Sequence, residues 1–278
     1  MTGGAWRWDE TLYEGSAAYY AAGRLPYPPE VAEALQRELA LDGTQRLLDI
    51  GCGPGSLTLL LAPCVHTAVA IDADADMIAV ARTEAARRRA ANVQWRHMRA
   101  EELPADLGRF SVVTFAQSFH WLDRPRVATA VRRMLEANGG CVHVQATTHR
   151  GDASEEQLSH PRPPHRQITE LVASYLGSTR RAGRGSLPAG TPSAEDEVFR
   201  AAGFHGPQRV EIGTAREVTR TADEVVAAVF SLSSAAPHLF GSRLRDFERD
   251  LRALLGETAP DGVYAERSCD TALDIWRQ

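Results

Sequence analysis

The sequence predicts an α/β protein built on one mostly parallel β-sheet with helices on both faces. Between residue 30 and about residue 150, short apolar segments typical of buried strands alternate with segments of helical periodicity. A turn with three glycines joins the first of these strands to the helix that follows it. Parallel strands require crossover connections, and helical crossovers cover the faces of a sheet, so the alternation indicates a parallel sheet covered on both sides.

The elements of this first half follow from apolar spacing and from residues that begin or end helices. Val31, Leu35 and Leu39 recur every four residues and define one face of a helix, which the two prolines before it help to begin. Pro63 ends the helix after the glycine turn. In chain order, the predicted segments are a helix at 29–39, a strand at 46–50, a helix at 55–62, a strand at 67–72, a helix at 75–90, strands at 93–98 and 110–116, a helix from 124 that Asn138 and Gly139 close, and a strand at 139–146.

After residue 150 the alternation stops. Residues 148–167 are polar and rich in proline, and residues 177–193, with four glycines and two prolines, predict a long loop. The other predicted segments are a short helix at 168–176, a helix at 194–204, a strand at 207–213, two helical pieces within 222–256 that separate near Pro237, and a final strand at 271–278.

The composition argues against several classes of protein. The 278 residues carry a formal net charge of −5, so no overall positive field attracts nucleic acid. No apolar run approaches the ~18 residues of a membrane span, and the first residues lack the basic and apolar pattern of a secretory signal. The cysteines form no CxxC pair, which favours neither a zinc site nor disulfides and is typical of a cytoplasmic protein; they are Cys52, Cys64, Cys141 and Cys269.

The glycine turn after the strand at 46–50 is the first candidate for a binding site. Gly51, Gly53 and Gly55 follow a G-x-G-x-G spacing, whereas a dinucleotide fingerprint would need its third glycine at Ser56. The turn also lacks the Gly-Lys-Ser/Thr ending of a P-loop. Glycines at the carboxyl edge of a parallel sheet let a ligand lie against the backbone, although the same pattern also occurs as a simple tight turn.

Asp72 supplies a second candidate at the end of the strand at 67–72. It lies nineteen positions after Gly53, a spacing at which an acidic side chain can accept hydrogen bonds from both hydroxyls of a ribose. The alternative is that Asp72 caps the helix that follows, alongside Asp74 and Asp76.

Four segments carry a family resemblance: LLDIGCGPGSLT at 47–58, AVAIDADADMI at 68–78, MRAEELP at 98–104 and FSVVTFAQSFHWLD at 110–123. In this order they resemble the successive motifs of class I S-adenosylmethionine-dependent methyltransferases, over about residues 28–150. The resemblance implies a Rossmann-like sheet of seven strands with one antiparallel strand, the last two strands coming from 207–213 and 271–278, and S-adenosylmethionine as the cofactor. It further implies a single methyltransferase domain over 1–278, with a core of about 28–150, 193–220 and 263–278 and helical cap segments at 1–27, 151–192 and 221–262.

The resemblance also implies which residues contact the cofactor. Asp72 would bind the ribose, Met77 would lie on the adenine face unless it is a core methionine, and Ala100 with Glu101 would border the adenine edge. Arg99 stands where many relatives have an aspartate that pairs with the adenine amino group, so Glu101 or a backbone carbonyl is expected to replace it. The methionine moiety would lie against Asp49, Gly51, Gly53, Gly55 and the segment from Phe115 to Trp121, which includes Gln117.

His120 is the candidate general base for a nucleophile that must lose a proton, because an ordinary histidine titrates near neutral pH. The alternative is that His120 and Trp121 only shape the wall of the pocket. His143 lies in a buried-strand pattern and is expected in the core, while His160 and His165 flank a proline-rich loop. No acidic or histidine cluster has ligand spacing, so no catalytic metal is expected.

The segments outside the predicted core would determine the acceptor. Residues 13–30 are similar to the cofactor-covering segment of small-molecule methyltransferases, and their candidate contacts are Tyr19, Tyr20, Arg24 and Tyr27. Arg24 either pairs with the methionine carboxylate or is a surface arginine. The apolar stretch 229–241 either lines an acceptor pocket or packs the cap against the core.

The leading functional hypothesis is methyl transfer to oxygen, nitrogen or carbon of a small molecule, such as one of secondary metabolism. A second hypothesis keeps the cofactor but replaces methyl transfer with a cyclisation or rearrangement, and a third is a non-catalytic cofactor-binding module. The glycine spacing disfavours a nicotinamide dehydrogenase. No Asn/Asp-Pro-Pro-Tyr-type motif follows the strand at 110–116, so the expected partner is a small-molecule acceptor, with no nucleic acid and no membrane, and the protein is expected to be a monomer or homodimer.

Overall fold

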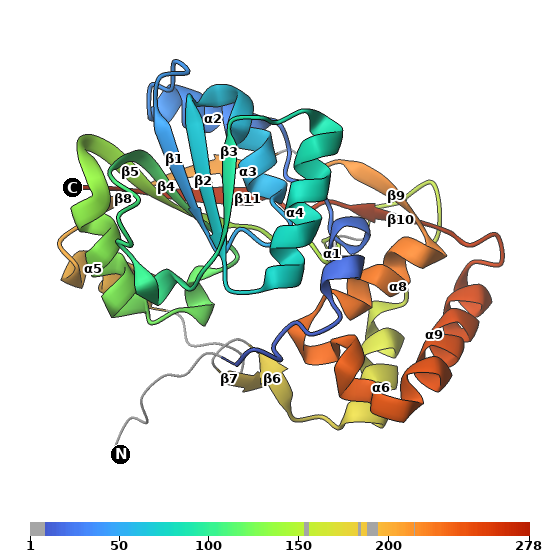
Figure 1. Cartoon of the computed structure of the whole chain (residues 1–278). Coiled ribbons are helices and arrows are strands. Elements are labelled where there is room, and N and C mark those ends of the chain that lie inside the picture. The colour runs from blue at the N-terminus through green and yellow to red at the C-terminus, as the bar shows by residue number, and fades with distance from the viewer. Residues whose placement is uncertain (1–8, 153–155, 183–184, 188–193, 214) are drawn as a thin grey trace.

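The computed structural model describes residues 9–278 apart from 153–155, 183–184, 188–193 and 214 (Figure 1). Its main feature is a seven-stranded β-sheet with the strand order β3-β2-β1-β4-β5-β11-β8. The neighbouring strands pair in parallel, except that β11 runs antiparallel to both β5 and β8. The predicted α/β class, with seven strands of which one is antiparallel, is therefore confirmed.

The elements have the following bounds. The strands are β1 (Arg46–Ile50), β2 (Thr67–Asp72), β3 (Val93–His97), β4 (Phe110–Ala116), β5 (Leu135–Gln145), β6 (Arg180–Ala182), β7 (Gly185–Leu187), β8 (His205–Ile212), β9 (Glu217–Thr221), β10 (Val263–Arg267) and β11 (Thr271–Arg277). The helices are α1 (Ala17–Gly23), α2 (Glu30–Glu38), α3 (Ser56–Leu61), α4 (Ala75–Arg88), α5 (Arg124–Met134), α6 (His165–Leu176), α7 (Glu195–Ala201), α8 (Ala222–Phe230) and α9 (Leu244–Thr258).

Both faces of the sheet are buried, which explains the nearly continuous apolar runs of its central strands. Leu47 and Leu48 are adjacent on β1 and point to opposite faces, because side chains alternate along a strand. Leu47 belongs to an apolar cluster that includes Leu35 of α2, and Leu48 to one that includes Val127 of α5 and Phe199 of α7. The glycine turn at the end of β1 is thus fixed from both sides.

A further apolar cluster, the helical cap, is formed by α6, α8 and α9. Phe230, Phe240 and Phe247 pack their rings together, and the centroids of Phe240 and Phe247 are 4.1 Å apart. Figure 1 shows these helices to one side of the sheet, with α1 between them and α4. The chain leaves β8 for the cap through β9 and returns to β11 through β10, and β9 and β10 pair with each other in an antiparallel ladder outside the main sheet.

The sequence predicts a helix from residue 124 that Asn138 and Gly139 close, and this predicted C-terminal end is wrong. Helix α5 ends at Met134, since Leu135 is extended and pairs with Phe110 of β4. Asn138 and Gly139, expected to close the helix, instead lie in β5, where the pairing with β4 shifts register after Leu135. Leu135 is fully buried, and its pairing in the sheet outweighs the local C-terminal signal of an Asn-Gly pair.

The loop expected at 177–193 is replaced in part by the antiparallel pair β6 and β7. The remainder of the expected loop, residues 188–193, falls outside the described residues.

Across the described ranges, no single helix is both long and apolar enough to cross a bilayer. Residues Ala222–Phe230 and Ser233–Thr258 reach that length and composition only when combined, and they are bent by 100° relative to each other.

A buried ion pair between β9 and β10 joins the cap to α1. Arg220 Nη1 donates to Glu266 Oε2 at 2.9 Å, and Arg220 Nη2 donates to the carbonyl oxygen of Gly23 at 2.8 Å. Glu266 Oε1 accepts from the Gly151 N–H at 2.8 Å and lies 2.6 Å from His165 Nε2. Burial alone would raise the pKa of Glu266, but the hydrogen bonds from His165 and Gly151, together with Arg220, lower that pKa to about 2.

Replacing Glu266 with glutamine is expected to destabilise the protein at neutral pH by about 3–5 kcal/mol, because Arg220 would stay buried without its counter-charge. Since folding lowers the pKa of Glu266 from 4.5 to about 2, its stabilising effect is complete above pH 4.5 and is lost as the pH falls toward 2. Urea unfolding of wild type and Glu266→Gln across this range should show the difference in unfolding free energy shrinking. The exposed Glu257→Gln variant is the control, and a pH-independent difference for Glu266→Gln would contradict the expectation.

Candidate functional site

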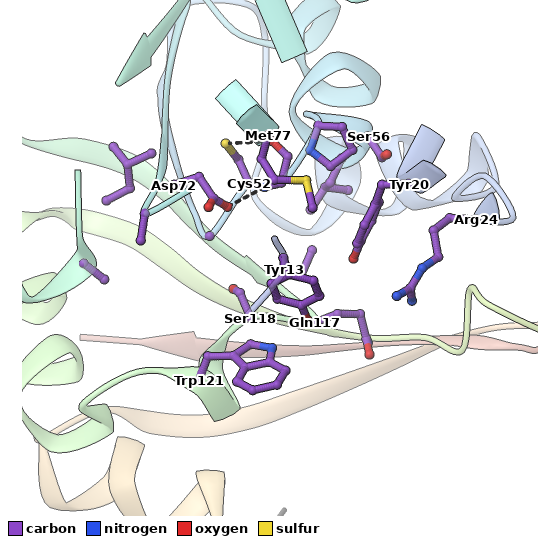
Figure 2. Close-up of a pocket in the computed structure, with 18 of the residues that line it drawn as sticks. Tyr13, Tyr20, Arg24, Cys52, Ser56, Asp72, Met77, Gln117, Ser118 and Trp121 are labelled. Atoms are coloured by element: carbon purple, nitrogen blue, oxygen red, sulfur yellow. Dashed lines mark hydrogen bonds between the residues drawn. The ribbon is translucent and has the colours of Figure 1, made fainter. Parts of the chain in front are cut away.

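A cavity, here called the glycine-turn cavity, opens at the carboxyl ends of β1, β2 and β4 (Figure 2). Parallel strands end at one edge of a sheet, and this edge is where ligands bind in open α/β folds. The N-terminal segment that includes α1 forms the opposite wall. Of the predicted site residues, the wall contains Gly51, Gly53, Asp72, Met77, Ala100, Glu101, Gln117, Tyr20, Arg24, Tyr27 and Trp121. The predicted site residues that do not line it are Asp49, Gly55, Tyr19 and His120.

Asp72 ends β2, and both of its carboxylate oxygens accept backbone hydrogen bonds. The Gly53 N–H donates to Oδ2 at 2.7 Å, and the Asp74 N–H donates to Oδ1 at 2.9 Å. Burial raises the pKa of Asp72 to about 6 despite these two bonds, which lower it. Asp74 accepts from the Met77 N–H at the start of α4, so the helix-capping role considered for Asp72 belongs to Asp74.

The three glycines of the turn serve different purposes, although all have positive φ angles. A Cβ at Gly51 would lie 2.5 Å from Cβ of Ser118, and a Cβ at Gly55 would lie 2.5 Å from the ring of Trp95. A Cβ at Gly53 would meet no atom of the described structure within 4 Å. Gly51 and Gly55 therefore permit close packing, whereas the bare backbone at Gly53 leaves room in the cavity.

Asp49 lies beneath the glycine-turn cavity and is only 1% exposed. It accepts hydrogen bonds from Thr58 Oγ1 at 2.5 Å and from Thr114 Oγ1 at 2.7 Å. Burial raises the pKa of Asp49, and the two hydroxyl groups lower it in part. These bonds join β1, α3 and β4 and hold the floor of the cavity.

Beyond Asp72 the wall is largely apolar, with the side chains of Met77 and Met98, and ends at Glu101. Glu101 is nearly buried, and its Oε1 accepts from the Asp123 N–H at 2.9 Å. Its other carboxylate oxygen lies 3.6 Å from Nε of Arg99. A carboxylate therefore stands beside Arg99 and is already hydrogen-bonded to the backbone, and its role at the adenine edge stays a prediction.

Arg24 lies at the end of the cavity opposite Asp72 (Figure 2). Its Nε and Nη2 donate to the hydroxyl and carbonyl oxygens of Ser231, both at 2.8 Å, and Nη1 donates to Thr148 Oγ1 at 3.4 Å. The guanidinium carbon stacks 4.4 Å from the ring centroid of Tyr20. Within the described residues no carboxylate forms an ion pair with Arg24, so its charge is available to an anionic ligand group.

Tyr13 lines the cavity, although the sequence analysis did not single it out. Its ring meets that of Trp121 edge to face, with centroids 5.7 Å apart, and lies 6.4 Å from that of Tyr20. Figure 2 shows it in the middle of the cavity, above Trp121. Tyr19 instead packs against Phe230 in the helical cap, 5.0 Å between centroids. Tyr13 precedes α1 in a segment without periodicity. The nearby tyrosines were the feature of the sequence that could have indicated a place for Tyr13 in the site.

The segment after β4 closes the lower side of the cavity. Gln117 has a positive φ of 57°, and its Nε2 donates to the carbonyl oxygen of Val144 at 3.2 Å. Ser118 Oγ donates to the carbonyl oxygen of Ile50 at 2.5 Å, which ties this segment to the end of β1. Gln117 also lines a neighbouring cavity and so stands at the junction of the two.

His120 lines this neighbouring cavity, here called the polar cavity, together with His143, Gln145 and Glu195. Burial, with a further contribution from His143, lowers the pKa of His120 to about 4, so the imidazole is neutral at pH 7. A base with so low a pKa removes protons less readily than an ordinary histidine, and the general-base role of His120 stays a prediction. His143, expected in the core, is buried but faces this cavity.

In the described part of the chain, no group of three or more histidine, cysteine or acidic side chains could hold a metal ion. His165, which flanks the proline-rich loop, is engaged with Glu266.

Residues 47–139 match the family model described as a methyltransferase domain. The uncharacterized methyltransferase Rv3342 of Mycobacterium tuberculosis (strain ATCC 25618 / H37Rv) is 35% identical over 134 residues, which cover 48% of this chain and 51% of that protein. The uncharacterized methyltransferase YcgJ of Bacillus subtilis (strain 168) is 28% identical over 132 residues, which cover 47% and 52%. The chain thus spans about half the length of the curated relatives it matches.

Solved structures extend the likeness to nearly the whole chain. The crystal structure of YcgJ from Bacillus subtilis matches with a TM-score of 0.50 and 19% identity, covering 90% of this chain and 99% of that one. The [4+2]-cyclase SpnF matches with a TM-score of 0.57 and 16% identity, covering 97% and 95%. At these identities the likeness concerns the fold alone.

The carboxyl group of Asp72 is expected to titrate near pH 6 in the folded, ligand-free protein, well above its ordinary value of 3.8. Because folding raises this pKa, the protonated form is favoured, and its contribution to stability is lost as the pH rises through about 6. Carbon-detected NMR of the aspartate carboxyl groups measures the midpoint, and the Asp72→Asn variant identifies the signal. A midpoint near 4 would contradict the expectation.

Proposed function

We propose that the chain transfers a methyl group from S-adenosylmethionine to oxygen, nitrogen or carbon of a small-molecule acceptor, because residues 47–139 match a methyltransferase domain. The observation that carries the proposal is a pair of opposite charges at the two ends of one cavity, Asp72 and Arg24, with bare glycine backbone between them (Figure 2).

The residues of the glycine-turn cavity fit this cofactor. An ionised carboxylate has about four lone-pair sites, and the backbone N–H groups of Gly53 and Asp74 occupy only two of those on Asp72. The remaining sites can accept hydrogen bonds from the two hydroxyls of a ribose. Met77 offers an apolar surface for a purine, and the free N–H groups of Arg24 suit the carboxylate of the methionine moiety.

The cofactor, when bound, supplies a methyl group that its sulfonium makes electrophilic. The protein contributes alignment and the exclusion of water, which together account for much of the rate in such displacements. Tyr13, Tyr20 and Trp121 form an aromatic wall over the cavity. The Leu25 N–H donates to the carbonyl oxygen of Thr148 at 2.6 Å and so fixes the covering segment to the chain just after β5.

A small acceptor is supported by the net charge of −5, which gives nucleic acid no attractive field. Calorimetry with S-adenosylmethionine and its demethylated product, S-adenosylhomocysteine, tests the cofactor. Absence of binding for both would refute the proposal.

The second candidate is a cyclisation or rearrangement in which the same cavity binds the cofactor without methyl transfer. The fold shared with SpnF, a [4+2]-cyclase, motivates this candidate, because the fold alone does not determine the reaction. Mass spectrometry of the products separates the two candidates: an acceptor that gains a methyl group supports transfer, and a substrate that isomerises supports the alternative.

Replacing Asp72 with alanine is expected to weaken S-adenosylhomocysteine binding about 5- to 150-fold, the effect of losing ~1–3 kcal/mol of hydrogen bonds to a charged group. Wild-type binding should also tighten as the pH rises through about 6, since the ionised carboxylate is the better acceptor. Calorimetry at several pH values measures both effects. Asp76→Ala, in the first turn of α4, is the matched control, and an unchanged Asp72→Ala dissociation constant would refute the ribose assignment.

Replacing Arg24 with leucine is expected to weaken the binding of S-adenosylhomocysteine about tenfold or more, because a charge-assisted bond to its carboxylate is lost. 5′-Methylthioadenosine, which lacks that carboxylate, should bind wild type and variant alike. Equal losses for the two ligands would show instead that Arg24 acts only by holding Ser231 and the covering segment in position.

A further inference from the structure

The polar cavity holds two histidines that the proposed cofactor site does not use. His143 on β5 is only 9% exposed, and His120 is half-buried. In the described ranges neither imidazole has a hydrogen-bond partner. A neutral imidazole offers one donor and one acceptor. The ring nitrogens of both histidines are absent from the buried polar atoms without a partner, so they are open to the polar cavity and available to a ligand.

The other side chains of the polar cavity leave mainly acceptor atoms available. The amide nitrogen of Gln117 donates to Val144, and that of Gln145 donates to Asp274 Oδ2 at 2.6 Å. Their carboxamide oxygens therefore remain for a ligand, along with one N–H of each amide. Carboxylates accept hydrogen bonds only, so Glu195 adds to this excess of acceptors.

The charges around the polar cavity disfavour an anion. Its lining includes three carboxylates, from Glu195, Glu211 and Asp270, but a single guanidinium, from Arg209. That guanidinium is already engaged, since Nη1 lies 3.0 and 3.2 Å from the carboxylate oxygens of Asp274 and Nε lies 3.4 Å from Glu211. Glu195 is paired in turn with Arg124 at 3.6 Å, so neither guanidinium is free for an anionic ligand. The two histidines add no positive charge at neutral pH, because burial lowers the pKa of each.

The position of the polar cavity relates it to the methyl group. Gln117 lines both cavities, and the short turn after it presents Trp121 to the glycine-turn cavity and His120 to the polar one. The rings of His120 and Trp121 lie 5.1 Å apart. The two cavities therefore adjoin at Gln117.

We propose that the polar cavity binds the methyl acceptor, that His120 and His143 contact it, and that the acceptor is a neutral or cationic molecule rich in hydroxyl or amino groups rather than a carboxylate or phosphate. The assignment of this ligand as the methyl acceptor rests on the proposed function. The excess of hydrogen-bond acceptors determines the chemical class, because it favours a ligand that donates, and the one guanidinium in the lining is already paired with carboxylates.

Histidine side-chain NMR tests the proposal on the full chain saturated with S-adenosylhomocysteine. The probes are bis-tris propane, a polyhydroxylated amine, and citrate, a hydroxylated carboxylate, each titrated at constant pH. The variants His120→Asn and His143→Asn assign the two signals, and the exposed His66→Asn variant is the control. Bis-tris propane should shift the His120 and His143 signals saturably while citrate does not, and the double variant should bind it about tenfold more weakly with unchanged affinity for S-adenosylhomocysteine.

Two results would overturn the proposal: no shift at either histidine while S-adenosylhomocysteine is bound, or equal shifts with citrate. A different result would separate it from the proposed function. If bis-tris propane shifts both histidines but neither S-adenosylmethionine nor its product binds, the methyltransferase proposal fails while the ligand preference of the polar cavity stands.

Discussion

The hydrogen bond from the Gly53 backbone to the carboxylate of Asp72 is the contact on which the site depends. It joins the turn after β1 to the tip of β2, where Gly51 and Cys52 already donate to the carbonyl oxygen of Ile71. The parallel register of β1 and β2 brings these groups together. Burial of the Asp72 carboxylate raises its pKa to about 6 and so lowers the free energy of unfolding at neutral pH. A ligand that donates hydrogen bonds to this carboxylate would offset that loss.

The two cavities have opposite chemistry, and the segment after β4 separates them. The glycine-turn cavity has the carboxylate of Asp72 at one end, the guanidinium of Arg24 at the other and apolar walls between. This arrangement suits an elongated zwitterionic ligand. The polar cavity offers acceptor atoms and little available positive charge. Gln117 stands between them in a left-handed backbone conformation that is uncommon for a side chain other than glycine, asparagine or aspartate. Such strain is typical of functional positions, and here it turns the chain so that Trp121 and His120 face different cavities.

The parts of the site that the sequence predicts are those at the ends of parallel strands. Gly53, Asp72 and Glu101 follow consecutive strands, so local motifs and the sheet's geometry suffice to bring them together. Tyr13 could not be found in this way, because its position depends on contacts distant in sequence that pack the covering segment against the cap. His143 was expected in the core for a related reason: a buried strand pattern does not tell which buried side chain meets a cavity and which meets other side chains. Leu135 likewise ends α5 early through its pairing with Phe110, which no helix signal contains.

The covering segment links the cofactor site mechanically to the cap. Gly23 at the end of α1 packs so closely on α8 that a Cβ there would lie 2.4 Å from the backbone of Ala227. Beside it, Arg24 is held by Ser231 just after α8, and Arg220 holds the Gly23 carbonyl from β9. The arginine that faces the glycine-turn cavity is therefore positioned by the cap rather than by the sheet. A shift of α8 relative to the sheet would therefore change the separation of Arg24 and Asp72, which links the geometry of the glycine-turn cavity to the packing of the cap.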